Sequence, residues 1–235
     1  MIDIRRGQER GSADLEWLKS YHTFSFGQYY DPRHMSFGPL RVINEDFIQP
    51  GQGFGTHSHK NMEIITYVLE GALEHKDSLG NGSIVKPGDV QRMTAGTGIQ
   101  HSEYNPSLSE PVHLLQIWIV PDAEGLEPGY EQVHLSIDQQ RNHLHLLGSR
   151  NSQQGVVTIH QKVDLYGAQL SQQGSVVHPL SAHRIAWLHV AKGVIQLNEK
   201  HDLMAGDAAA ISDLHEIKVH GQSEDAEILL FDMVA

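Results

Sequence analysis

Cysteine is absent from this chain of 235 residues. Without thiols the protein cannot contain disulfide bonds, iron–sulfur clusters, thiolate zinc sites or cysteine nucleophiles, so nitrogen and oxygen atoms remain as the only strong metal ligands. Long apolar runs are also absent. The longest, around Leu114–Val120, falls well short of the roughly 20 residues that a transmembrane helix needs.

Basic residues are few, since 17 Lys and Arg stand against 29 Asp and Glu, which gives a formal net charge of −12. Such acidity argues against direct binding to nucleic acid or to an anionic membrane, because both require basic surfaces. No apolar signal-peptide segment follows the two arginines near the start. The sequence therefore predicts a soluble, cytoplasmic protein.

Short segments of β type dominate the chain. Runs rich in β-branched and aliphatic residues, separated by Gly, Pro, Asn and Asp, predict an all-β sandwich or barrel. The clearest runs are LRVINEDFI, EIITYVLEG, VHLLQIWIV, RIAWLHVAKGVIQL, EIKVH and EILLFDMV. We expect few, short helices: one over Ser12–Ser20, with Ser12 as its N-cap, and a weaker candidate over Ser136–His143.

Two stretches of the chain share an order of turns. In each, a strand ends in a glycine, Gly71 or Gly193, and a Gly-Asp turn into another strand follows. This order indicates an internal duplication, although Gly-Asp turns between strands are also common. The connector at residues 121–129 is rich in Pro, Gly and acidic residues, so we predict one domain over residues 1–125 and another over 126–235.

Histidine is abundant, with 17 residues, and its spacing is informative. His57 and His59 lie two residues apart in GQGFGTHSHKNMEIITYVLEG, as do His101 and Glu103 in KPGDVQRMTAGTGIQHSEYN. Such pairs on neighbouring strands would point four ligands at one position. Three imidazoles and one carboxylate suit Fe(II), Mn, Ni, Cu or Zn, and they leave coordination positions free for water, dioxygen or substrate.

An HxH pair alone is weak evidence for a metal site. His143 and His145 form a second such pair, which has no matching pair nearby and no glycine-rich approach, so we interpret them as ordinary histidines. His57 and His59 differ because the segment GQGFG precedes them and a second ligand pair follows. This combination favours a metal site at the first pair.

The first segment resembles the cupin motif, in which a glycine is followed by HxH and then by a glutamate and a glycine. Together with FSFGQYYDP, LRVIN and MTAGTGIQHSEYN it is similar to the pirin family, in particular to bacterial pirin-like proteins described as quercetin 2,3-dioxygenases. The resemblance implies a bicupin, with two jelly-roll β-barrels in one chain. The family's metal ligands, from HxH and HxE, correspond to His57, His59, His101 and Glu103.

A second glutamate competes for the carboxylate role. Many cupins use the glutamate shortly after HxH, and Glu63 occupies that position with the same strand parity as His57 and His59. Parity leaves both carboxylates open. The pirin resemblance implies that Glu103 is the ligand, with Glu63 in an outer role, and either glutamate could accept a proton from the substrate.

The second barrel can be compared with the first by counting from the equivalent turns. The positions that correspond to the four predicted ligands are Pro179, Ser181, Val219 and Gly221. These residues do not restore the paired spacing of donors. We therefore expect the domain at residues 126–235 to have no metal site.

Two functions are compatible with the resemblance. The first is a dioxygenase, most simply with Fe(II), in which a flavonol such as quercetin loses a proton and reacts with dioxygen, with cleavage of the heterocyclic ring and release of carbon monoxide. The second is a non-enzymatic, metal-dependent regulator of transcription or of a metabolic enzyme, which would act through a protein partner as a redox sensor. The resemblance favours the dioxygenase.

Overall fold

A computed structural model describes residues 1–151 and 153–235 and confirms the all-β class. Its helical segments are two short 3-10 turns, η1 (Gly7–Glu9) and η2 (Ile137–Gln139). In the described part of the chain, no helix has the length and apolar character needed to cross a membrane.

Contacts divide the chain into two units. The first unit comprises Gly11–Leu135 and Asn151–Gln161, and the second comprises Met1–Arg10, Ser136–Arg150 and Lys162–Ala235. Each unit therefore contains a short segment from the other half of the sequence. The domain boundary at residue 125 stays a prediction about the linear sequence.

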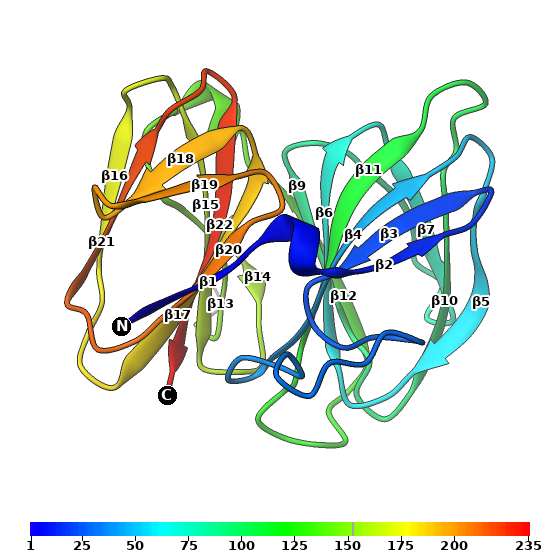
Figure 1. The fold of residues 1–235 in the computed structure, drawn as a ribbon. Helices are drawn as coiled ribbons and strands as arrows, with labels where there is room; N and C mark the ends of the chain where they lie inside the picture. The colour runs from blue at the N-terminus through cyan, green and yellow to red at the C-terminus, as the bar shows by residue number, and fades with distance from the viewer. Residues whose placement is uncertain (152) are drawn as a thin grey trace. The chain divides into compact units, whose positions relative to one another are not determined.

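The first unit contains a seven-stranded and a four-stranded antiparallel sheet (Figure 1). The larger sheet has the order β12 (Gly129–His134), β9 (Asp89–Thr94), β6 (Glu63–Glu70), β11 (Val112–Ile119), β4 (Leu40–Ile48), β3 (Leu18–His22) and β2 (Gly11–Asp14). The smaller sheet has the order β5 (Gly53–His59), β10 (Ile99–Tyr104), β7 (Leu73–Asp77) and β8 (Gly82–Val85).

The second unit repeats this plan. Its larger sheet includes, in order, β1 (Ile2–Arg5), β20 (Ala208–Ile211), β17 (Arg184–Lys192), β22 (Ala226–Val234), β15 (Val163–Leu170) and β13 (His145–Ser149). Its four-stranded sheet has the order β16 (Ser175–Pro179), β21 (Glu216–Gly221), β18 (Val194–Leu197) and β19 (His201–Met204). The two four-stranded sheets match strand for strand, as the predicted duplication requires.

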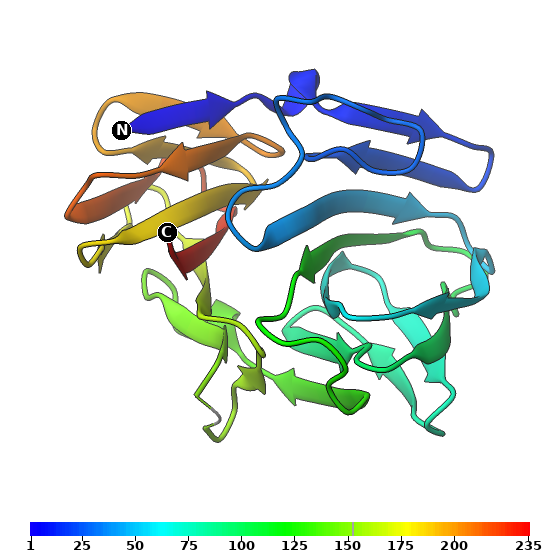
Figure 2. The same cartoon turned by 90° about the horizontal axis from the view of Figure 1, so that it is seen from below.

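The chain's first strand belongs to the second unit. β1 pairs antiparallel with β20, and Figure 2 shows it beside the strands of the C-terminal half. Ile2 and Ile4 pack against the hydrophobic core of that unit. Arg6 Nη1 lies 2.7 Å from Asp207 Oδ2, and the Gly7 amide donates a hydrogen bond of 2.7 Å to Asp207 Oδ1.

The reverse exchange involves residues 151–161, which join the first unit. This segment contains the short strand β14 (Val157–Thr158). The Arg92 side chain donates a hydrogen bond of 2.8 Å from Nε to the Thr158 carbonyl oxygen, and it also pairs with Glu131. Polar contacts thus hold this segment against strand β9.

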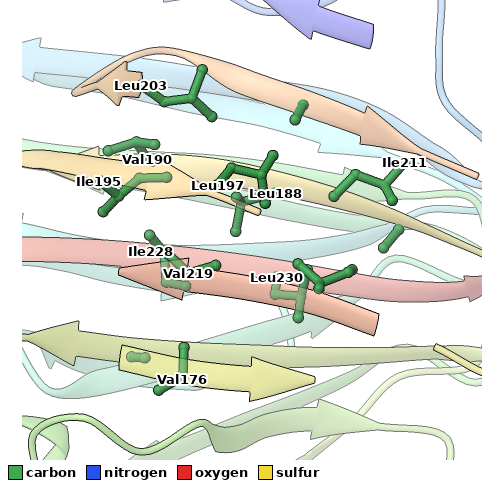
Figure 3. Packing of buried hydrophobic residues seen from close by; sticks show 14 of the residues in the cluster. Val176, Leu188, Val190, Ile195, Leu197, Leu203, Ile211, Val219, Ile228 and Leu230 are labelled. Atoms are coloured by element: carbon green, nitrogen blue, oxygen red, sulfur yellow. The ribbon is translucent and has the colours of Figure 1, made fainter. Parts of the chain in front are cut away.

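Alternating side chains build the core of each unit. In the second unit, one face of each sheet supplies buried aliphatic residues, such as Leu188 and Val190 from β17 and Val219 from β21, which interdigitate between the two sheets (Figure 3). The first unit has a comparable cluster, which includes Ile48, Val112 and other residues of both its sheets. Burial of these alternating faces is what selects the strand registers.

The predicted helix over Ser12–Ser20 is wrong. This segment forms the hairpin of β2 and β3, in which Gly11 pairs with His22 and Asp14 with Lys19. β3 then pairs with β4, and its alternate residues Leu18, Ser20 and His22 are buried. Pairing along β4 therefore overrides the weak local helix signal. Of the second helix candidate, only the 3-10 turn η2 forms.

Candidate metal centre

Two neighbouring strands of the four-stranded sheet bring three histidines together. β5 carries His57 and His59, β10 carries His101, and the register places His57 directly opposite His101. The ring centroids of the three imidazoles lie 4.4 to 4.9 Å apart. One donor nitrogen from each lies within 4.8 Å of the others, so the three form a candidate site for a divalent metal ion.

Burial keeps two of these imidazoles neutral. Burial, followed by the neighbouring imidazoles, lowers the pKa of His101 to about 3 and that of His59 to about 4. Within the described residues, both ring nitrogens of His101 lack a hydrogen-bond partner, and so does Nε2 of His59. Neutral, buried imidazoles with unshared lone pairs are the form in which histidine binds metals.

His57 is oriented by its own strand. Its Nδ1 lies 2.8 Å from the carbonyl oxygen of Gly55. Because a carbonyl oxygen can only accept, Nδ1 must carry the proton, and the lone pair is therefore on Nε2. A backbone hydrogen bond that fixes the tautomer of a histidine is common beside metal sites.

Glu103 lies in the barrel interior and is 2% exposed. Its carboxylate accepts hydrogen bonds from Gln116 Nε2, at 3.0 Å, and from Thr66 Oγ1, at 3.4 Å. The Trp118 indole donates to Gln116 Oε1, which fixes the amide with its NH₂ group toward Glu103. These contacts hold the carboxylate in one orientation beside the histidines.

The four predicted ligands fall into two overlapping donor groups. The first contains His57, His59 and His101, whereas Glu103 groups with His101 and with a further histidine, His75. His101 is common to both groups. The assignment of all four predicted residues to one ion therefore stays a prediction.

His75 is a site residue that the sequence reasoning missed. It lies fully buried on β7, opposite Glu103, and its ring centroid is 5.3 Å from that of His101. Its Nε2 lies 3.3 Å from Asp77 Oδ2. The alternation of His75 and Asp77 signals a shared face, but only the register of β7 against β10 shows that this face carries the metal ligands.

Glu63 lies on the opposite face of its sheet from the barrel interior. Ile64, the next residue, packs in an interior cluster, so Glu63 points outward. Its Oε2 accepts hydrogen bonds from the backbone N and from Nδ1 of His160, at 3.2 and 3.1 Å. β5 ends at His59 and β6 begins at Glu63 in the other sheet, so strand parity does not extend from His59 to Glu63. Among the described residues, Glu63 belongs to neither donor group, and its role near the metal stays a prediction.

A cavity of about 610 Å³ opens beside the histidines in the first unit. His57, His59 and Glu103 contribute to its wall, and aromatic rings line much of the rest. The Trp17 and Phe54 rings meet edge to face at 5.3 Å, and Trp118 packs edge to face against His59 at 5.0 Å. An apolar cavity with a few polar groups at one end suits a planar aromatic ligand.

A row of polar side chains crosses the larger sheet below this cavity. The register places His22 opposite Asn44, Asn44 opposite Gln116, and Gln116 opposite Thr66. Cross-strand partners share a face, so the row is directed into the barrel. Two of its members, Gln116 and Thr66, are the hydrogen-bond donors to Glu103.

Asp46 stands one row further along β4 and is 4% exposed. Burial is the largest cause that raises the pKa of its carboxyl to about 7. Repulsion from Glu103 and Glu45 raises the pKa as well, while a hydrogen bond with the Ser20 side chain opposes the increase. A buried carboxyl that titrates near neutral pH in a cavity wall is typical of a functional site.

In the second unit, β16 and β21 take the places that β5 and β10 have in the four-stranded sheet of the first unit. β16 and β21 pair Val176 with Val219, and both side chains are buried. His178 lies on β16, but its Nε2 contacts Asp232 Oδ2 at 2.8 Å. The expectation of a barrel without a metal site stays a prediction.

Comparison with known proteins places the chain in a family. A family model described as Pirin matches residues 4–119, and one described as the quercetinase C-terminal cupin domain matches residues 146–233. The chain is 48% identical over 233 residues to a protein of Escherichia coli (strain K12) named quercetin 2,3-dioxygenase, with 99% of each chain covered. It is 39% identical over 233 residues to a pirin-like protein of Caulobacter vibrioides, again with 99% of each chain covered.

Solved structures agree with this placement. The crystal structure of YhhW from Escherichia coli has a TM-score of 0.94 and 48% identity, and the match covers 99% of this chain and 97% of that one. A crystal structure of bacterial pirin YhhW in complex with nickel(II) has a TM-score of 0.93 and 47% identity over 100% and 99% of the two chains. In sequence and in fold, along nearly its whole length, the chain belongs to the pirin family of cupin proteins.

Proposed function

We propose that the protein is a metal-dependent dioxygenase that cleaves flavonols such as quercetin, a quercetin 2,3-dioxygenase. The observation that carries this proposal is a cluster of three imidazoles beside an aromatic cavity, next to a buried carboxylate. The name of the relative from Escherichia coli supports the same substrate class.

The residues present fit a resident divalent metal ion. His57, His59 and His101 would supply three imidazole nitrogens, and Glu103 would supply a carboxylate oxygen. The ring nitrogens of the fully buried His101 have no other partner in the described chain, which is costly unless an ion satisfies them. We propose Fe(II), which this donor set suits, with Mn, Ni, Cu and Zn as alternatives. When bound, the metal supplies a Lewis acid for a substrate hydroxyl and a route for electrons to dioxygen.

The protein's own groups bind and deprotonate the substrate. The aromatic walls formed by Trp17, Phe54 and Trp118 would hold the flavonol rings and exclude water from the reacting atoms. Glu103 would accept the proton of the flavonol hydroxyl on a carboxylate oxygen. Gln116 and Thr66 would keep this carboxylate in place while it does so.

The test combines metal analysis with an aerobic quercetin assay. Protein expressed with each of the five metals available should contain about one metal ion per chain and consume quercetin with at least one of them. His101→Ala should lose both properties. His143→Ala is the matched control, because it removes an exposed imidazole from the second HxH pair.

The possible results separate the two functions that the sequence left open. Metal content well below one ion per chain would refute the metal site. Metal binding with quercetin consumption no faster than in His101→Ala would refute the dioxygenase. That second result would favour a regulatory protein that uses the same ligands and acts through a protein partner.

A further inference from the structure

Two buried acceptor oxygens in the cavity wall lack a partner. Among the residues that the structure describes, Oδ1 of Asp46 and Oδ1 of Asn44 make no hydrogen bond, although each residue is only 4% exposed. Both residues line the aromatic cavity. Burial of an unsatisfied acceptor is unfavourable, so a wall of this kind is adapted to a ligand that brings hydrogen-bond donors.

These acceptors extend away from the metal centre. Asn44 lies opposite Gln116, which holds Glu103, so it belongs to the same row as the predicted proton acceptor. Asp46 lies two residues further along β4, which corresponds to about 7 Å in an extended strand. A ligand that contacts both Glu103 and Asp46 therefore needs polar groups at separate positions.

The surroundings of Asp46 indicate which kind of donor would bind there. Leu18 and Phe54 line the same cavity, and the cross-strand neighbours of Asp46 are Leu114 on β11 and Ser20 on β3, whose side chain hydrogen-bonds the carboxyl. Asp46 belongs to neither group of donors that could hold a metal ion within the described residues. A largely apolar setting with single acceptors favours a neutral hydroxyl on an aromatic ring over a hydrated cation.

We propose that Asp46, assisted by Asn44, is a specificity-determining residue that accepts a hydrogen bond from a ring hydroxyl of the substrate, remote from the hydroxyl at the metal centre. The protein would thus select polyhydroxylated flavonols over flavonols with only the metal-binding hydroxyl. This inference rests on the proposed dioxygenase function and narrows its substrate class.

Binding can be measured without turnover. Nickel(II)-loaded protein would be titrated without oxygen with quercetin and with 3-hydroxyflavone, which keeps the metal-binding hydroxyl and lacks the others, and quenching of tryptophan fluorescence would report affinity. We expect wild type to bind quercetin about 10-fold or more tightly than 3-hydroxyflavone, because a site built for a hydroxyl discriminates against analogues without it. Asp46→Ala should abolish most of this preference while leaving the affinity for 3-hydroxyflavone within about 3-fold.

Glu45→Gln is the matched control. Glu45 is the adjacent acidic residue of β4, but it faces away from the cavity and contacts His113 Nε2 at 2.8 Å. The control should keep the wild-type preference. Because 3-hydroxyflavone needs the same folded cavity, its retained binding shows that Asp46→Ala has not simply unfolded the protein.

Each other outcome has a defined meaning. Equal affinity of wild type for the two flavonols, or an equal loss of both in Asp46→Ala, would overturn the role of Asp46 even if quercetin is cleaved. An effect of Glu45→Gln as large as that of Asp46→Ala would also overturn it. Failure of wild type to bind either flavonol would refute the proposed function, and the specificity inference with it.

Discussion

Replacement of Gly53 by alanine should separate the two strands that carry the histidines. Gly53 lies opposite Tyr104 where β5 pairs with β10. A Cβ atom at this position would lie 2.2 Å from the backbone oxygen of Glu103 and 2.6 Å from the Cα atom of Tyr104. Ordinary contact begins near 3.4 Å, so the backbones must part by more than 1 Å. Strain of this kind in a packed region typically costs about 1–3 kcal/mol.

The consequence for the metal centre follows from the strand that moves. His57 lies four residues further along β5, whereas His101 lies on β10, so a displacement of β5 separates their donor atoms. Because a misplacement of about 1 Å can cost on the order of 100-fold in a positioned site, we expect Gly53→Ala to bind nickel(II) about 10- to 100-fold more weakly. Calorimetric titration of the metal-free protein would measure this affinity, and urea unfolding would measure the loss of stability.

Gly55→Ala is the control for this experiment. Its Cβ atom would meet only the Tyr104 hydroxyl, at 3.7 Å, so the same chemical change two residues away should be tolerated, with a change within about 0.5 kcal/mol. Nickel(II) affinity should also stay close to that of wild type. Equal behaviour of the two variants would refute the view that close approach of β5 and β10 positions the ligands.

Three further predictions address the surrounding contacts. Gln116→Leu removes the amide that holds Glu103, so nickel(II) affinity in calorimetry should fall about 10- to 100-fold; unchanged affinity would contradict the role of this amide. Glu63→Ala should lower the free energy of unfolding in urea by about 1–3 kcal/mol without weakening nickel(II) binding. A loss of nickel(II) binding would instead indicate that Glu63 contributes to the metal centre. The metal-free protein should lose stability as the pH falls from about 6.5 toward 4. In the folded chain the pKa values of His59 and His101 are lowered from 6.5 to about 4 and about 3, so in this range the unfolded chain binds more protons than the folded chain does. Urea melts of His101→Gln should show a shallower pH dependence, and an equal slope would refute this cause.

The sequence predicted the strands that are buried on one or both faces. LRVINEDFI forms β4 and EIITYVLE forms β6, because branched apolar residues fit a pleated, packed sheet regardless of which strand they pair with. The hairpin at Gly11–His22 was missed because its own residues favour a helix weakly, and only pairing with β4 decides the outcome. That pairing joins residues more than 20 positions apart, which local patterns do not encode.

Local sequence patterns also predicted the metal centre only in part. Spacing within a strand identified His57 with His59, and His101 with Glu103, since side chains two apart share a face. Parity could not be carried across the turn between β5 and β6, where Asn61 adopts a φ of 49° and the chain passes to the other sheet, so the sequence did not show which face carries Glu63. His75 required the register between β7 and β10, which the sequence does not specify by itself.

The pairing of β1 with β20 has a consequence for synthesis of the chain. Ile2 is made about 200 residues before its partner Ile211, and at about 5–20 residues per second this delay amounts to roughly 10–40 s. Residues 11–135 can collapse during that interval, while β1 has to wait without its partner. A gene cut at residue 125 would give two incomplete products: the C-terminal piece would lack an edge strand, and the N-terminal piece would display a strand with nothing to pair with.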